Sequence, residues 1–131
     1  MTGDAPTTRR EATFRALLMA VFLAAMEATI VSTALPRIVA ELGGLSLYGW
    51  VGTAYLLAAT VTMPLHGRLA DLFGRKPVFQ FGLALFFLGS ALAGSARSIA
   101  LLLVGRAVQG LGAGSIQPVA MTIIGDLYPV E

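Results

Sequence analysis

The sequence predicts an all-α membrane protein with four transmembrane helices. Of its 131 residues, 56% are hydrophobic and only 12% are charged, and the mean hydropathy is +0.80. Soluble domains carry about 25% charged residues. Four apolar runs follow one another with short polar connections, each long enough to cross a bilayer with about 20 helical residues. We expect these runs at residues 16–35, 49–69, 77–96 and 99–124.

The composition argues against enzyme and metal chemistry. The chain has no cysteine and a single histidine, and it lacks the H-E-x-x-H and G-x-S-x-G patterns. Its formal charge of +2 is small and scattered, which argues against a nucleic-acid partner. We therefore expect no enzymatic activity, no metal site and no organic cofactor.

The first element is a polar tail, residues 1–15, followed by the apolar run 16–35. A charged tail before an apolar run is also typical of a secretory signal peptide. This run is too long for that, and an acidic residue, Glu27, lies in its middle. Because proline disfavours helix in the residue before it, we expect the first helix to end at Leu35, before Pro36.

The second run begins beside Tyr48 and Trp50, which are typical of aromatic anchors at the headgroup boundary. The third run is the most uniformly apolar, and we expect it to have much lipid contact. A short turn at residues 95–98 separates it from the fourth run, which stops at residues 126–129.

The densest group of charges lies between the second and third runs. Residues 67–76 hold four charges in ten positions, with His66 just before them. Because spanning runs lie on both sides, we expect a tight loop on one membrane face, bracketed by Gly67 and Gly74. Pro77 suits the first turn of the next helix, where its missing N–H is no loss.

The distribution of Lys and Arg predicts the orientation. Six lie on the side of the tail and of residues 67–76: Arg9, Arg10, Arg15, Arg68, Arg75 and Lys76. Two lie on the other side: Arg37 and Arg97. Cytoplasmic flanks carry the excess of positive charge, so we expect a cell-membrane protein with a cytoplasmic amino terminus. Asp126 then falls on the cytoplasmic side, level with the loop.

Glu27 is a carboxyl group near the middle of the first run. A charge at the bilayer centre costs about 3 kcal/mol or more, so such residues usually face a partner or a water-filled cavity. A carboxyl group there can exchange a proton when its surroundings change. We interpret Glu27 as a proton-coupling residue. The alternative is a paired or permanently neutral glutamate that only holds helices together.

Arg106 is the corresponding cation in the fourth run. At ~1.5 Å per residue, it lies about 10 Å from the outer end of its span, and Glu27 lies about 12 Å from the outer end of the first. This similar depth permits an ion pair or a water-bridged relay. Gln109, Ala113 and Gln117 share the helical face of Arg106, which predicts a polar stripe on a cavity wall.

Glycines also recur in the fourth run, at Gly105, Gly110, Gly112 and Gly114. Small residues allow neighbouring helices to approach closely in a membrane. We interpret these glycines as packing residues.

Three stretches resemble one family. Residues 27–36, E-A-T-I-V-S-T-A-L-P, are similar to the helix-one motif of fourteen-helix drug:proton antiporters, although Asp is commoner than Glu at its first position. Residues 67–76, G-R-L-A-D-L-F-G-R-K, resemble the loop signature of the major facilitator superfamily. Residues 106–114, R-A-V-Q-G-L-G-A-G, resemble the helix-four motif of its proton-coupled members. The resemblance implies an exporter of lipophilic, often cationic compounds, driven by proton influx through alternating access.

The resemblance also implies roles for individual residues. Arg106 would exchange protons with Glu27. Asp71 would dock at the start of a helix in the carboxyl-terminal half of the transporter, where the helix dipole favours a negative charge, and Arg75 would pair with Asp126. The residues of this conformational loop are Gly67, Asp71, Gly74, Arg75, Lys76 and Asp126. Since the resemblance covers the amino-terminal four helices, we expect a partial transporter domain over residues 16–131, with the remaining helices absent from this chain.

Two other functions remain open at this point. A free-standing four-helix multidrug transporter that works as a dimer also uses a glutamate in its first helix, but it would not need the 67–76 loop. A membrane scaffold without transport activity would use the polar groups only for assembly. For the antiporter, we expect as partners the lipid bilayer, a small lipophilic or cationic substrate and the remaining transporter helices, with protons as the coupling ion.

Overall fold

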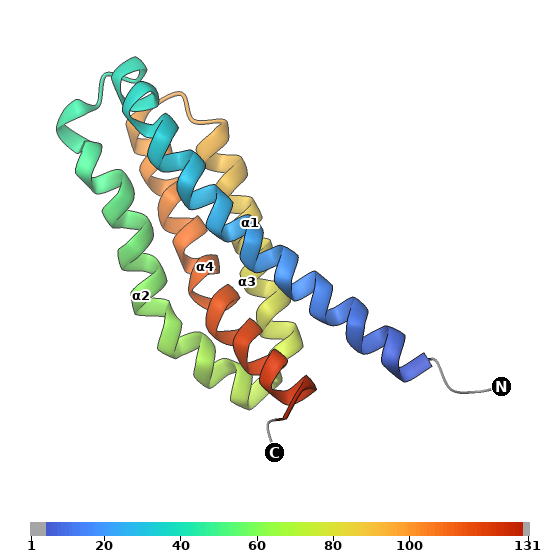
Figure 1. The fold of residues 1–131 in the computed structure, drawn as a ribbon. Helices are drawn as coiled ribbons and strands as arrows, with labels where there is room; N and C mark the ends of the chain where they lie inside the picture. The colour runs from blue at the N-terminus through green and yellow to red at the C-terminus, as the bar shows by residue number, and fades with distance from the viewer. Residues whose placement is uncertain (1–4, 130–131) are drawn as a thin grey trace.

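Four long helices make up the protein in a computed structural model that describes residues 5–129 (Figure 1). They are α1 (Ala5–Glu41), α2 (Tyr48–Phe73), α3 (Arg75–Gly94) and α4 (Ile99–Leu127), with a short 3-10 helix, η1 (Leu45–Leu47), before α2. Each of the four long helices is apolar and long enough to cross a membrane. The predicted all-α class with four spanning helices is confirmed.

Helix α1 is longer than predicted at both ends. Residues 5–15, which we expected as a polar tail, are helical, and residues 1–4 of that tail lie outside the described residues. The expected end at Pro36 is wrong, because α1 continues through this proline to Glu41. A proline leaves one backbone carbonyl without its helical N–H partner, and spanning helices tolerate this where neighbouring groups or a local adjustment of the helix satisfy that carbonyl.

Gly43 ends α1. It has φ +72°, a left-handed conformation that favours glycine. The N–H of Gly44 donates to the carbonyl of Val39 (3.1 Å), and the N–H of Gly43 donates to that of Ala40 (3.3 Å). These two bonds form a Schellman motif, which satisfies carbonyl groups at a helix end. A methyl group on Gly44 would lie 2.6 Å from Ile99 Cγ1, so this connection also packs on the start of α4.

The charged segment 67–76 is mostly helical, where we expected a loop. Gly74 alone joins α2 to α3, with φ +93° and ψ 154°, and such a φ favours glycine. Pro77 lies in the first turn of α3, as expected. Gly67 lies inside α2, where a methyl group would meet nothing within 4 Å. The turn is therefore made by one glycine and is not bracketed by two.

The other helix ends differ from expectation by a few residues. Helix α4 begins after Ser98, whose Oγ accepts a hydrogen bond from the N–H of Leu101 (3.2 Å), as in a typical N-cap. It ends at Leu127, just before Pro129, and α3 spans Arg75–Gly94 in place of 77–96.

Helix α4 is the centre of the bundle, lying between α2 and α3 with α1 across it (Figure 1). In the most apolar 18-residue stretch of α4, 50% of the residues are buried, compared with 28% in α3, 11% in α1 and 6% in α2. Glycines permit this burial. A methyl group on Gly114 would lie 2.5 Å from Thr62 Oγ1 of α2, and one on Gly112 would lie 2.9 Å from Phe86 Cα of α3. The interpretation of these glycines as packing residues is confirmed.

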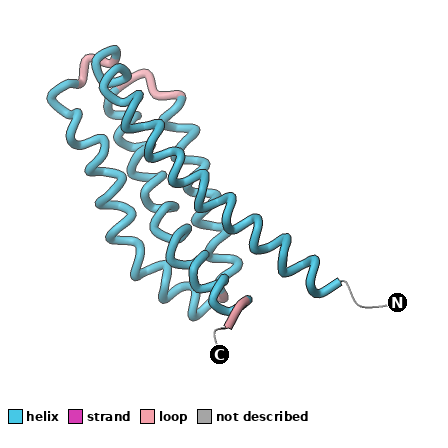
Figure 2. Tube along the Cα trace, viewed as in Figure 1, coloured by secondary structure: helices cyan, strands magenta, loops and turns pink. Residues whose placement is uncertain are grey.

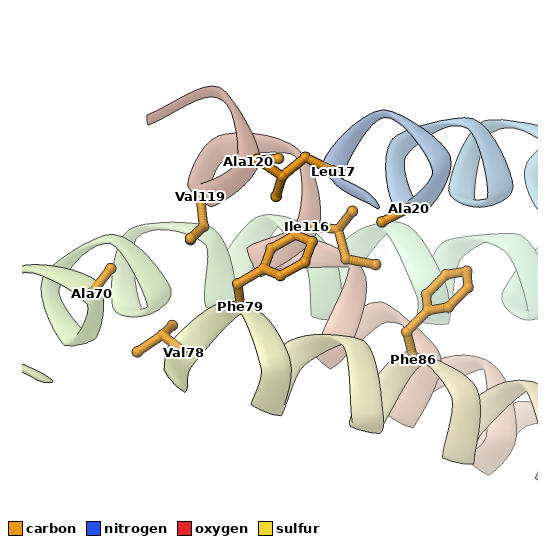
Figure 3. Packing of buried hydrophobic residues seen from close by; sticks show 9 residues of the cluster. All are labelled: Leu17, Ala20, Ala70, Val78, Phe79, Phe86, Ile116, Val119 and Ala120. Atoms are coloured by element: carbon orange, nitrogen blue, oxygen red, sulfur yellow. The ribbon is translucent and has the colours of Figure 1, made fainter. Parts of the chain in front are cut away.

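All four helices contribute to the larger apolar core (Figure 3). Its buried residues are Leu17, Ala20, Ala70, Val78, Phe79, Phe86, Ile116, Val119 and Ala120. A second cluster consists of Leu35, Val39, Val51 and Leu102. The α1–α2 and α3–α4 connections lie together at one end of the bundle (Figure 2), so consecutive helices alternate in direction.

Candidate functional site

A buried ion pair joins α1 to α4. Arg106 Nη1 donates to Glu27 Oε1 at 2.9 Å, across 79 positions of sequence. The side chain of Arg106 is 6% exposed and that of Glu27 is 17% exposed, so the pair is largely shielded from solvent. The ion pair that the similar depth of Glu27 and Arg106 in their spans permits is therefore present in the structure.

Gln109 extends this pair along α4. Arg106 Nη1 also donates to Gln109 Oε1 at 2.8 Å, one helical turn away. Gln109 is almost fully buried, and a methyl group on Gly89 of α3 would lie 2.5 Å from its Cα. The backbone of α3 therefore holds Gln109 in position beside the guanidinium group.

Tyr55 is a member of the site that sequence reasoning missed. The Arg106 Cζ atom lies 4.3 Å from the centroid of its ring, within the range of a cation–π interaction. Its depth agrees with that of Glu27 and Arg106, but nothing in the sequence shows that α2 turns this side chain toward Arg106. Tyr55 lies seven residues after Tyr48 at the start of α2, or about 10 Å at ~1.5 Å per residue. Three helices thus meet at one guanidinium group.

Three polar atoms of this network have no hydrogen-bond partner among the described residues: Glu27 Oε2, Arg106 Nε and Gln109 Nε2. Buried polar atoms are usually paired. The two nitrogens are donors, whereas Glu27 Oε2 is an acceptor that can take up a proton while Oε1 keeps its contact with Arg106. One carboxylate oxygen of Glu27 is therefore bound to Arg106, and the other is left as an open acceptor position inside the bundle.

The polar stripe predicted on α4 divides between two places. Arg106 and Gln109 belong to the network, whereas Ala113 and Gln117 line a neighbouring cavity of about 270 Å³ between α1, α2 and α4. Tyr55 contacts Arg106 and also lines this cavity. The other lining residues are Val21, Ala24, Ala25, Ala28 and Ile116. Because most of them are small, there is open space directly beside the Tyr55 ring.

The residues of the predicted conformational loop lie away from this network, where α2 joins α3. Arg75 forms an ion pair with Asp126 of α4. Together with the exposed Lys76, both line a cavity of about 560 Å³ beside α1. Asp71 is exposed and forms no ion pair within residues 5–129. The structure thus brings Arg75, Lys76 and Asp126 together at one cavity, whose lining does not include Gly67 or Asp71.

The amino-terminal part of α1 reaches the same end of the bundle. The rings of Phe14 and Tyr128 lie 5.5 Å apart in an edge-to-face arrangement. Arg10 Cζ lies 5.2 Å from the centroid of the Tyr128 ring. The basic residues near the amino terminus and those of segment 67–76 therefore share one end, as the orientation argument requires.

Sequence similarity points to one family. The family model of the Major Facilitator Superfamily matches residues 17–131. The chain is 44% identical over 128 residues to the "Multidrug transporter protein MdtP" of Bacillus subtilis, with 98% of this chain and 24% of the relative covered. It is 46% identical over 115 residues to "Multidrug resistance protein 3" of the same bacterium, with coverage of 88% and 22%. It is 45% identical over 116 residues to "Efflux pump dotC" of Dothistroma septosporum, with coverage of 88% and 20%. The chain thus spans roughly a fifth to a quarter of the length of these relatives.

Proposed function

The chain belongs to the Major Facilitator Superfamily, and from this membership we propose that it forms the first four helices of a proton-coupled exporter of lipophilic or cationic compounds. The observation that carries the proposal is the ion pair between Glu27 and Arg106, a proton acceptor and its counter-ion buried between two spanning helices. Relatives named as multidrug transporters and efflux pumps support export. They also weigh against an enzyme and against a scaffold without transport activity.

In the proposed cycle, the Glu27 carboxylate exchanges a cationic compound for a proton. In the ionised state, the carboxylate attracts both Arg106 and a cationic compound in the cavity beside Tyr55. A proton that arrives from outside binds Glu27 Oε2 and neutralises the carboxyl group, so the compound loses its partner and is released outward. The proton then leaves Oε2 toward the cytoplasm, which restores the ion pair with Arg106. Alternating access would connect these two states to opposite sides of the membrane.

The location and partners follow from the same proposal. We assign the chain to the cell membrane with its amino terminus in the cytoplasm, because Lys and Arg are concentrated on that side. Large apolar side chains exposed on α1 and α2 would face lipid or further transporter helices. They include Leu18, Met19, Phe22, Leu23, Leu56, Leu57 and Val61. The exposed Asp71 would contact such a helix, and the Arg75–Asp126 pair would stabilise one conformational state. Protons serve as the coupling ion without an organic cofactor.

The test is efflux of a lipophilic cation from proteoliposomes that contain the complete transporter, under an imposed pH gradient. Glu27→Gln keeps the shape of the side chain but holds it neutral, so we expect it to abolish proton-driven efflux while substrate binding persists. Glu41→Gln, at an exposed acid of the same helix, is the matched control and should pump normally. Normal efflux by Glu27→Gln would mean that Glu27 is structural.

A further inference from the structure

Tyr55 lies between the ion pair and the neighbouring cavity. The centroid of its ring is 4.3 Å from Arg106 Cζ, and the same side chain lines the cavity with Gln117. It is also well inside α2, away from the headgroup boundary where tyrosine commonly serves as an anchor. The proposed cycle requires the cavity and the ion pair, but it does not explain why an aromatic ring lies between them.

Backbone packing fixes the height of Tyr55 in the bundle. Gly110 lies one helical turn after Arg106 on α4. A methyl group on Gly110 would collide with the carbonyl oxygen of Tyr55 and would lie 2.9 Å from Ala58 Cβ. Because glycine has no side chain, α2 can approach α4 this closely. The main chain of Tyr55 is therefore held against α4 within one turn of Arg106.

The guanidinium group of Arg106 makes hydrogen bonds through Nη1, while its Cζ atom lies over the ring of Tyr55. At the edge, Nη1 donates to Glu27 and Gln109. The face has no N–H to donate and is suited to stacking on an aromatic ring. Within the described part of the chain, the guanidinium group has three side-chain neighbours: Glu27 from α1, Tyr55 from α2 and the neutral Gln109 from its own helix. Helix α3 contributes only its backbone, at Gly89.

We propose that Tyr55 is a positioning residue for proton coupling, whose ring holds the Arg106 guanidinium in place while Glu27 gains and loses its proton. This inference rests on the proposed function of the Glu27–Arg106 pair. When Glu27 is neutral, Arg106 loses its counter-ion. The guanidinium group then keeps only uncharged contacts, which are Glu27 Oε1, the ring of Tyr55 and the amide of Gln109. Without the ring, the guanidinium group is free to leave Glu27, and the carboxylate loses its nearby positive charge.

Two variants separate the ring from its hydroxyl group. Tyr55→Phe keeps the ring and Tyr55→Leu removes it. In proteoliposomes that contain the complete transporter, we expect Tyr55→Phe to pump within about twofold of the wild type and Tyr55→Leu to lose about tenfold. The pH profile of efflux should also change in Tyr55→Leu, because the positive charge is no longer held beside the Glu27 carboxylate.

Tyr48→Leu is the matched control, since Tyr48 is an exposed tyrosine at the start of the same helix. It should leave both the rate and the pH profile unchanged. Gly110→Ala, which displaces Tyr55 without altering it, should reproduce the changed profile of Tyr55→Leu. If Tyr55→Leu shows a normal rate and a normal pH profile while Glu27→Gln is inactive, Tyr55 only packs and the inference is overturned.

A second measurement does not depend on transport. Nuclear magnetic resonance of the purified, arginine-labelled transporter reports how fast the side-chain N–H protons of Arg106 exchange with solvent. We expect slow exchange in the wild type and in Tyr55→Phe, and exchange about tenfold faster in Tyr55→Leu. Equal exchange in all three overturns the inference. If Glu27→Gln pumps normally, the proposed function fails, and the exchange rates alone decide whether Tyr55 holds Arg106 in place.

Discussion

At the scale of single residues, the guanidinium group of Arg106 joins three helices. It donates to Glu27 of α1 and to Gln109 of α4, and its Cζ atom lies over the ring of Tyr55 of α2. A lysine ammonium group would supply the charge, but it has neither the flat face nor the fixed fork of donors. The choice of arginine therefore follows from the number and direction of its neighbours.

Arg106→Lys tests whether the shape of the guanidinium group matters beyond its charge. We expect it to lower the free energy of unfolding by about 1.5–3 kcal/mol, the usual contribution of a hydrogen bond to a charged group, and to reduce efflux. Thermal unfolding in detergent and efflux from proteoliposomes measure the two effects. Arg97→Lys, at an exposed position between α3 and α4, is the control and should change neither. Wild-type stability together with wild-type efflux in Arg106→Lys would contradict the account.

The sequence identifies most members of this site but not Tyr55. Glu27, Arg106 and Gln109 can be predicted because a charged or amide side chain within an apolar run is costly and needs a reason to be there. A tyrosine within such a run needs no special explanation. The contact of Tyr55 with Arg106 depends on which side of α2 packs against α4. The close approach of the two backbones at Gly110 determines that side.

At the scale of helices, the ends of α1 and α2 show where local sequence rules fail. Pro36 predicts the end of α1, but the helix runs through it to Glu41, as spanning helices can where the one freed backbone carbonyl finds another partner or the helix adjusts locally. The stop comes at Gly43, whose left-handed conformation closes a Schellman motif. Likewise, the charges of segment 67–76 predict a loop, yet a single residue, Gly74, makes the turn. In both cases a positive-φ glycine decides the boundary.

Gly112→Ala tests the close approach of α4 to α3. A methyl group there would lie 2.9 Å from Phe86 Cα, a backbone atom that cannot move aside alone. We expect a loss of about 1–3 kcal/mol of stability, as for an overpacked core, measured as the free energy of unfolding in detergent. Gly125→Ala, on the same helix, is the control, because a methyl group at Gly125 would meet nothing within 4 Å. The stability of this variant should equal or exceed that of the wild type. Equal stability of the two variants would mean that α3 and α4 are not packed this closely.

At the scale of the whole molecule, the order of the four helices could be predicted, but their arrangement could not. The third run is the most uniformly apolar, yet α3 is better covered than α1 or α2, and α4 is the most buried helix. Lipid and neighbouring helices are both apolar, so composition does not distinguish contact with one from contact with the other. The glycines of α4 are the feature that distinguishes it as the central helix, because only small residues permit backbone contact on two sides.

The orientation of the bundle has a direct test, because residues 1–131 contain no cysteine and a single introduced thiol in this part of the protein can be compared with the unlabelled parent. Phe73→Cys places a thiol beside the α2–α3 turn, and Ser98→Cys places one between α3 and α4. In intact cells, an impermeant thiol reagent should label Ser98→Cys and should leave Phe73→Cys unlabelled. A permeant reagent should label both, which controls for accessibility. The reverse pattern would place the amino terminus outside the cell.

The central claim is that Glu27 exchanges its proton for a cationic compound, and proton release on binding measures this exchange directly. Tetraphenylphosphonium, a lipophilic cation, is added to the complete transporter in weakly buffered detergent solution, and a pH dye reports the protons set free. At a pH where Glu27 is protonated, we predict about one proton released for each cation bound, because the two binding equilibria are linked through one carboxyl group. Glu27→Gln should bind without releasing a proton, and the control Glu41→Gln should match the wild type. Release from Glu27→Gln equal to that from the wild type would contradict the account and would assign proton coupling to another group.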